Sequence, residues 1–164
     1  MSMNGHYLCV TPEQLDAVRR APTTIHELLD SEEDEGEFPD GLHVDIDKSW
    51  HAIQFLLTGD PWAGEPPLQY VVMGGAELGE EDVGYGPARY LTPEEVQAAA
   101  SAIASISGEA LWSRFDEQAF AAAEIYPQGW SEDDKESVVE HYETLREFFA
   151  FAGAEGNAMI VYLA

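Results

Sequence analysis

Three side chains that can bind metal ions or exchange protons alternate along one short stretch of the chain. His43, Asp45 and Asp47 are separated by single apolar residues. Successive side chains of a strand point to opposite faces, so these three polar side chains would share one face. Imidazole suits transition metals and carboxylate oxygens suit hard cations, so His51 or His6 could complete a metal site here. The same alternation is also typical of an ordinary strand with one polar face.

After this stretch the pattern changes from strand-like to helical. Apolar residues then fall on more than one side of a helix, and they are Trp50, Ile53, Phe55, Leu56 and Leu57. A helix with apolar residues on opposite sides needs cover on both sides. The sequence therefore predicts a central, covered helix over residues 48–57. Asp47 is expected to cap its start, and the turn residues 58–61 are expected to end it.

Arg89 is one of only seven basic residues in the chain. A guanidinium group can hold a carboxylate through two hydrogen bonds, and we expect Asp45 or Asp47 to be its partner. The alternative is that Arg89 holds the acid group of a ligand. The candidate ligand-binding residues are therefore His43, Asp45, Asp47, His51, Tyr85 and Arg89.

Other groups that could do chemistry favour structural roles. Gly74, Gly75 and Gly79 lack the spacing of a phosphate-binding loop and are followed by acidic residues, so they are expected in turns. Cys9 lies in an apolar strand, where a thiolate is disfavoured. His141 is expected at the border of a helix's apolar face, with acid–base chemistry as the open alternative.

The charge of the chain is its most extreme property. It has 32 acidic and 7 basic residues among 164, a formal net charge of −25. Binding to nucleic acid or to an anionic membrane needs a basic surface, so both are disfavoured. An acidic field attracts a basic protein partner, although the same charge also serves solubility.

Length and composition predict one folded domain. A hydrophobic content of 45% provides for a core, and the single cysteine excludes an internal disulfide. No apolar run approaches the roughly 20 residues of a membrane-spanning helix. The N-terminal residues do not have the pattern of a signal peptide, so we expect a cytoplasmic protein. No cofactor is indicated, and the oligomeric state is left open.

Local signals predict where helices and strands begin. Residues 5–10 and 157–164 favour strands, and the second is apolar almost throughout, as in the interior of a sheet. Thr11 and Thr92 are each followed by Pro and, three residues later, by Gln or Glu. This arrangement is typical of a helix start with a capping box.

The longest helix is expected to start at Ser131. Its apolar residues recur at spacings of three and four, and they are Val138, Tyr142, Leu145, Phe149 and Ala152. We also expect a short helix at 23–30, an acidic loop at 31–37, a strand or helical turn at 68–73 and an extended segment at 87–91. The predicted class is α+β, with a small sheet that includes the N- and C-terminal strands and packs with about five to six helices.

Several stretches in order along nearly the whole chain resemble one known family. They are residues 3–7, 45–50 continuing into 55–59, Gly74-Gly75, residues 84–91, residues 125–127 before Trp130, and the apolar C-terminal strand. In these stretches the chain is similar to the YfbM-like family of small bacterial proteins, which has no assigned function. The resemblance implies a single cytoplasmic α+β domain over residues 1–164, and it brings no catalytic residues.

Two functions remain as expectations. The first is a non-catalytic binding or interaction module whose acidic surface meets a basic protein partner, because no complete catalytic set is present. The second is a small enzyme or ligand-binding protein, with or without a metal ion, whose site lies around His43, Asp45, His51 and Arg89.

Overall fold

The computed structural model describes residues 3–25, 43–82 and 86–164. Within them, five strands form one antiparallel sheet in the order β2-β1-β5-β4-β3. The strands are β1 (Gly5–Val10), β2 (His43–Asp45), β3 (Glu77–Asp82), β4 (Pro87–Leu91) and β5 (Ala158–Leu163). The seven described α-helices are α1 (Pro12–Arg20), α3 (Trp50–Thr58), α4 (Tyr70–Met73), α5 (Pro93–Ala104), α6 (Gly108–Trp112), α7 (Glu117–Ala122) and α8 (Lys135–Ala154). Three short 3-10 turns are η1 (Pro22–Thr24), η2 (Asp47–Ser49) and η3 (Glu132–Asp134).

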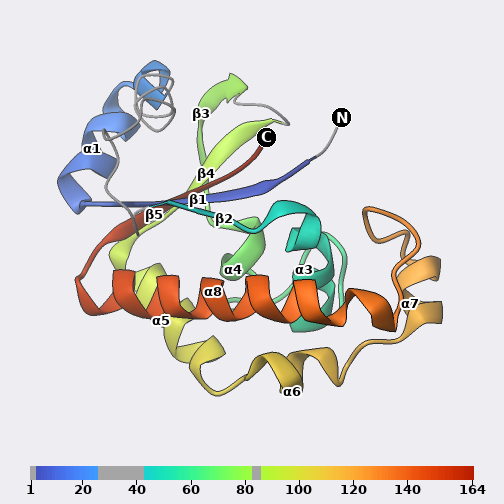
Figure 1. The fold of residues 1–164 in the computed structure, drawn as a ribbon. Coiled ribbons are helices and arrows are strands. Elements are labelled where there is room, and N and C mark those ends of the chain that lie inside the picture. Colours follow the sequence, from blue (N-terminus) through green and yellow to red (C-terminus); the bar gives the residue numbers. More distant parts are fainter. Residues whose placement is uncertain (1–2, 26–42, 83–85) are drawn as a thin grey trace.

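The sheet separates two apolar layers of unequal size. Most helices lie below the sheet and α1 lies above it (Figure 1). The larger layer, between the sheet and α3, α5 and α8, includes Tyr7, Met159 and Val161. The smaller layer, against α1, includes Leu8 and Ile160. β1 and β5 contribute to both layers because successive strand residues face opposite ways. The predicted α+β class is confirmed.

The first and last strands lie in the middle of the sheet. β1 lies between β2 and β5, and β5 lies between β1 and β4. Every residue of β5 except Leu163 is buried. An apolar run without alternation is typical of a strand that is covered on both faces. The prediction of an interior C-terminal strand is therefore confirmed.

Two helices begin with the reciprocal hydrogen bonds that the sequence predicts. The Gln14 N–H donates to Thr11 Oγ1 over 3.1 Å, and the Thr11 N–H donates to the Gln14 side chain over 2.9 Å. Thr92 and Glu95 repeat the arrangement at the start of α5. These starts are predictable because both partners lie within one turn of the chain.

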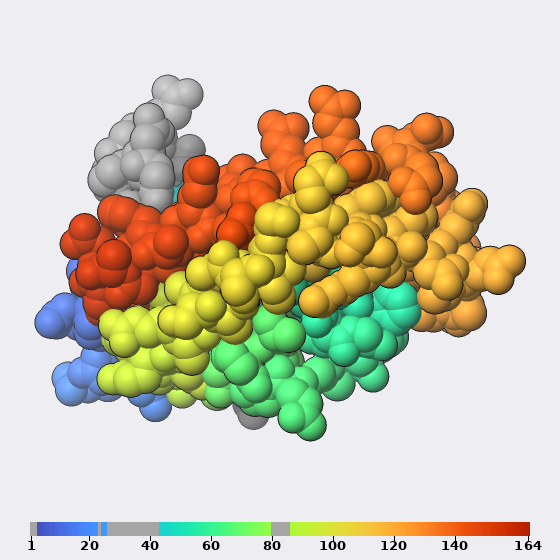
Figure 2. All heavy atoms as spheres, turned by 90° about the horizontal axis from the view of Figure 1, so that it is seen from below, coloured from blue at the N-terminus to red at the C-terminus, as the bar shows by residue number. Residues whose placement is uncertain are grey.

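α8 is the longest described helix, and it contributes to the larger apolar layer. Its five predicted apolar residues, from Val138 to Ala152, are all buried. Ser131 caps η3, the 3-10 turn that leads into α8. Ser131 is therefore a cap, as predicted, but of this turn rather than of α8 itself. α5 and α6 follow one another along the length of α8 (Figures 1 and 2). None of the described helices is both long and apolar enough to cross a membrane.

α3 is covered on nearly all sides, as predicted. Ile53, Leu56 and Leu57 are buried, and the half-buried Phe55 packs edge-on against Phe120 with 5.3 Å between ring centroids. Gly59 ends the helix in a left-handed conformation with a φ of 79°. This conformation suits glycine because it has no Cβ.

The predicted capping role of Asp47 is wrong. α3 begins at Trp50, after η2, and neither element has a side-chain cap among the described residues. Asp47 has a φ of 51°, and its N–H donates to Oδ1 of Asp45 over 2.7 Å. The chain leaves β2 through a left-handed residue, a conformation that Asp tolerates better than most residues. The carboxylate that holds this turn is therefore that of Asp45.

Further differences concern segments with mixed patterns. Residues 68–73 contain the helix α4, and β3 is an unexpected, acidic edge strand whose one apolar side chain, Leu78, is buried. Charged residues are common on edge strands, where they oppose pairing with another chain. The predicted helix at 23–30 lies mostly outside the described residues, and the acidic loop at 31–37 lies wholly outside them. The described helices number seven rather than five to six.

Candidate functional site

The structure does not bring the predicted site residues together. His43 and Asp45 lie on β2, at one end of the sheet order, whereas Arg89 lies on β4 with β1 and β5 between them. Three strand spacings separate β2 from β4 by about 14 Å. His51 lies on α3, and Tyr85 lies outside the described residues. Asp47 lines a hollow, which is described below.

The predicted pairing of Arg89 with Asp45 or Asp47 is wrong. Its guanidinium lies 3.5 Å from a carboxylate oxygen of Glu77, its cross-strand neighbour on β3, and donates to the Gly75 carbonyl over 3.0 Å. Both side chains of this ion pair are about half exposed, at 44% and 54%. An exposed pair of this kind contributes little to stability. The sequence could not show this partner because β3 was not recognised as a strand.

The side chain of His51 is buried, and both of its ring nitrogens are hydrogen-bonded to the backbone. Its Nδ1 accepts a hydrogen bond from the Tyr126 N–H over 2.7 Å, and its Nε2 lies 3.1 Å from the Pro61 carbonyl oxygen, to which it donates. Burial lowers the pKa of His51, which favours the neutral ring that these two bonds require. The residue thereby holds the segment that follows Tyr126 against α3.

His43 stacks on His6, and the His6 Nδ1 lies 3.1 Å from the His43 Nε2. Tyr162 stacks on the other side of His6, with 4.8 Å between ring centroids. Among the described residues, no three His, Cys, Asp or Glu side chains gather in a way that could hold a metal ion.

A hollow of about 220 Å³ lies where three segments meet, and we call it the polar hollow. Its walls are η2, the loop that follows Tyr126 and one face of η3 and α8: Asp47, Lys48, Ser49, Pro127, Gln128, Gly129, Trp130, Asp134, Ser137 and His141. Within it, Ser49 Oγ and His141 Nδ1 are hydrogen-bonded over 2.7 Å. Ser49 is only 4% exposed. Its buried hydroxyl therefore holds the imidazole ring of His141 in place through this bond.

A second hollow, of about 250 Å³, lies on the other side of the same loop, and we call it the apolar hollow. Phe120, Ala121 and Ile125 form its apolar wall, Glu117 and Glu124 are its acidic residues, and it shares Gln128, Gly129 and Trp130 with the polar hollow. α7 and the start of α8 lie together at this end of the molecule (Figure 1).

The two hollows contain the two non-glycine residues that have a positive φ among the described residues. These are Asp47 in the polar hollow, with a φ of 51°, and Glu124 in the apolar hollow, with a φ of 54°. Such residues are uncommon, and they are often found at functional sites. We therefore take the two hollows together as the candidate functional site.

Sequence reasoning placed Asp47 in a site and missed the rest. The Ser49–His141 contact joins residues that are 92 positions apart. One signal was present: Asp134, Ser137 and His141 recur at three and four positions on the predicted helix, so they share one face. The sequence does not show that this polar face meets η2.

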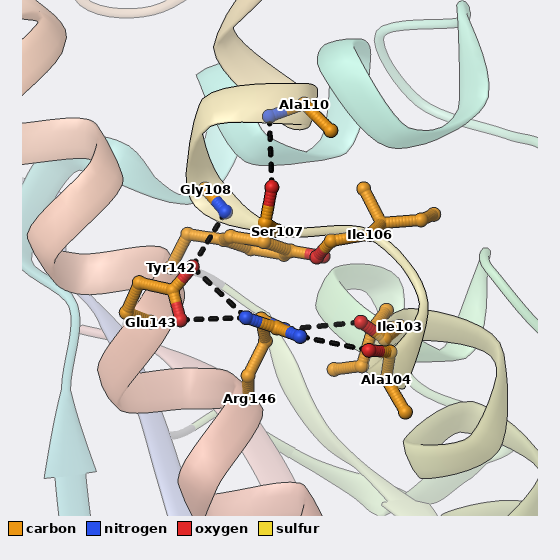
Figure 3. A network of polar contacts seen from close by, with 9 residues as sticks. All are labelled: Ile103, Ala104, Ile106, Ser107, Gly108, Ala110, Tyr142, Glu143 and Arg146. Atoms are coloured by element: carbon orange, nitrogen blue, oxygen red, sulfur yellow. Dashed lines mark hydrogen bonds and ion pairs between the residues drawn. The ribbon is translucent and has the colours of Figure 1, made fainter.

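A separate polar cluster on α8 consists of groups that are all paired within the protein, and we call it the closed cluster. Arg146 donates to the carbonyls of Ile103 and Ala104 at the end of α5, and to both carboxylate oxygens of Glu143 (Figure 3). Glu143 in turn accepts from the Gly108 N–H at the start of α6 over 2.5 Å. A cation at a helix C-terminus and an anion at a helix N-terminus are both favourable. This cluster therefore serves the fold.

Fold and hollows together define a small α+β domain whose surface pockets carry acidic side chains. The model of a family described as a domain of unknown function, DUF1877, matches residues 1–162, and the chain belongs to this family. YfbM from Escherichia coli, a protein of unknown function, has a similar structure with a TM-score of 0.74 and 24% identity over 100% of each chain. This likeness shows the fold alone. No curated protein matches the chain.

Proposed function

We propose that this protein is a non-catalytic binding module that uses its acidic surface to dock a basic protein partner. The observation that carries the proposal is unneutralised charge, with 32 acidic and 7 basic residues. Among the described residues, four of the basic side chains already form ion pairs, and they are Arg20, Arg89, Lys135 and Arg146. Most acidic side chains therefore have no cation to neutralise them, and their field attracts a basic surface.

Acidic side chains gather in a shallow depression at the start of α8, with a volume of about 580 Å³. We call it the acidic depression, and it is lined by Glu109, Glu132, Asp133, Lys135, Glu136, Val139 and Glu140. Lys135 lies 3.0 Å from Glu109, and the Trp112 indole donates to Glu132. The other three carboxylates are exposed and form no ion pair with the described residues.

Neutralising these three carboxylates tests the proposal. We expect the wild-type protein to retain a basic protein from cell lysate at low salt and to release it at high salt. The reason is that the screening length falls from about 30 Å at 0.01 M salt to about 3 Å at 1 M. The triple variant Asp133→Asn, Glu136→Gln, Glu140→Gln should lose most of this retention.

The matched control removes three exposed carboxylates elsewhere, in the variant Glu13→Gln, Glu94→Gln, Glu147→Gln. It has the same net charge as the first variant and should retain the partner. Equal losses in the two variants would show that net charge alone acts. A wild-type protein that retains no salt-sensitive partner would refute the docking function.

A small enzyme or ligand-binding protein is the second candidate. The observation that favours it is the Ser49–His141 hydrogen bond in the polar hollow, because a hydroxyl bonded to an imidazole is the beginning of a nucleophile–base pair. A fluorophosphonate probe tests it by mass spectrometry. Labelling of Ser49 that is lost in His141→Ala supports an enzyme. If Ser49 stays unlabelled at excess probe, the enzymatic function is refuted.

We also propose a cytoplasmic location. A single, buried cysteine is typical of proteins from reducing compartments, and burial raises the pKa of the Cys9 thiol. Fractionation of cells that express the chain tests this location, and recovery from an oxidising compartment would contradict it.

A further inference from the structure

The loop that separates the two hollows presents one aromatic side chain to both of them. Trp130 lines the polar hollow and the apolar hollow, and its indole N–H donates to the Tyr126 carbonyl over 3.3 Å. Tyr126 is itself held by His51 through its backbone N–H. The aromatic wall is thus fixed through the buried helix α3, and a ligand in either hollow would meet it.

The charge of the two hollows favours a cation in each. Together they carry four carboxylates, on Asp47, Asp134, Glu117 and Glu124, against one ammonium, on Lys48. No ion pair among the described residues engages any of these five side chains. The Asp134 carboxylate caps the Ser131 N–H, while the other three carboxylates accept no hydrogen bond from the described residues. Their charge is therefore available to a ligand.

The remaining walls fit the rest of a basic side chain. Lysine and arginine have apolar stems that pack on apolar surface while their charged ends stay polar, and they also pack on aromatic rings. Phe120, Ile125 and Trp130 supply such surface in the apolar hollow.

The Ser49–His141 pair adds a hydrogen-bonding group to the polar hollow. His141 Nδ1 is taken by the Ser49 hydroxyl, and Nε2 has no partner among the described residues. A hydroxyl accepts as well as donates, so Ser49 can hold the tautomer in which Nε2 accepts a hydrogen bond. A guanidinium or ammonium group donates such a bond.

The size of the hollows favours side chains over a whole cofactor. Their volumes, about 220 and 250 Å³, lie below the roughly 300–1,000 Å³ of small-molecule sites. We propose that the two hollows bind a segment of the basic partner, with one arginine or lysine side chain entering each hollow on either side of Trp130. This inference rests on the proposed docking function and adds to the acidic depression a site for two individual basic side chains.

Titration of the full chain with triarginine at low salt tests the assignment, with triglutamate as the probe of opposite charge. The variant Asp47→Asn, Asp134→Asn removes two charges but keeps the geometry. Asn tolerates a positive φ, and its amide oxygen can still accept from the Ser131 N–H. We expect triarginine binding to weaken about tenfold in this variant, and also in Glu117→Gln, Glu124→Gln.

The control Glu94→Gln, Glu147→Gln loses the same charge elsewhere and should weaken binding less than about twofold. An equal loss in the control, equal binding of triglutamate, or no saturable binding at millimolar triarginine overturns the assignment. If both hollow variants still retain a basic partner from lysate, the assignment fails and the docking function stands. If triarginine binds as expected but no partner is retained, the docking function fails, and the hollows are shown only to bind basic side chains.

Discussion

Two polar regions on helix α8 differ in how completely their groups are paired. In the closed cluster, Glu143 and Arg146 reach the ends of two other helices, and every polar group that they meet has a partner (Figure 3). Earlier in the chain, Asp134 of η3 and Ser137 and His141 of α8 line the polar hollow. There, the Ser137 hydroxyl and the His141 Nε2 have no partner among the described residues.

The difference separates polar residues that hold the fold from polar residues that are available to a ligand. A buried or half-buried polar group without a partner lowers stability, so most are paired within the protein. A helix end offers fixed carbonyls and N–H groups as partners, and the closed cluster uses them. In the polar hollow, His141 instead bonds to the side chain of Ser49, so we expect the groups of this hollow to affect binding more than stability.

Removing Arg146 should have the largest effect on stability. Arg146→Ala removes the hydrogen bonds to the Ile103 and Ala104 carbonyls and the ion pair with Glu143, and we expect a loss of about 2–3 kcal/mol in the free energy of unfolding. Urea denaturation followed by circular dichroism measures it. Arg20→Ala is the control, because its pair with Asp16 is exposed, and it should cost less than about 0.5 kcal/mol. If the two variants lose the same amount of unfolding free energy, the closed cluster stabilises the fold no more than an exposed ion pair does.

The sequence predicts those parts of the fold whose partners are close along the chain or whose environment is uniform. The capping boxes at Thr11 and Thr92 join residues three positions apart, and β5 is apolar because both of its faces are covered. β3 is harder to predict because its six residues include one apolar side chain, Leu78, and therefore show no alternation of apolar and polar residues. Local sequence patterns therefore predict helices and strands more readily than they predict which of these elements pack against one another.

The candidate site was harder to predict, because its contacts are long-range. Asp47 is predicted both as a candidate ligand-binding residue and as a helix cap, and the left-handed turn after β2 excludes the cap. His141 was expected at the border of an apolar face, and its bond to Ser49 depends on how α8 crosses η2. Arg89 was paired with the wrong strand because the sequence does not give the order of strands.

His51 shows how a fully paired polar residue supports the hollows, and its pairing predicts a pH dependence. Its Nδ1 accepts from Tyr126, so protonation of Nδ1 would break that bond within the core. Burial lowers the pKa of His51 below that of an unfolded histidine, about 6.5, so near and below this pH the unfolded chain binds more protons. The stability that neutral His51 contributes is thus present above about pH 6.5 and is lost as the pH falls through the folded-state pKa.

His51→Gln isolates this contribution, because glutamine keeps a donor and an acceptor but does not ionise. We expect the wild-type protein to lose stability relative to His51→Gln between about pH 7 and pH 5, by at most about 1.4 kcal/mol per pH unit. Unfolding free energies of both proteins at each pH give the difference, which cancels the titration of the many carboxylates. Parallel pH profiles would show that His51 is not held neutral.

Replacing Ser49 tests whether the polar hollow is built for binding. Ser49→Ala leaves His141 Nδ1 without its partner and should cost about 1 kcal/mol in stability. It should also weaken triarginine binding, since the ring is no longer fixed. Ser137→Ala, in the same hollow but with no hydrogen bond among the described residues, should change stability by less than about 0.5 kcal/mol. A stability loss with unchanged binding would make Ser49 and His141 part of the fold alone.

The backbone at Asp47 gives the smallest effect and the sharpest contrast between stability and binding. At a φ of 51°, Asp47→Gly relieves the strain of a side chain but adds freedom to the unfolded chain, so we expect stability to change by less than about 0.5 kcal/mol. Asp47→Ala keeps the strain without the tolerance of Asp for this conformation, and it should cost about 1 kcal/mol. Both variants remove the carboxylate, so both should weaken triarginine binding to the same degree. If instead binding follows stability across the two variants, the turn matters only for the fold, and the polar hollow belongs with the closed cluster.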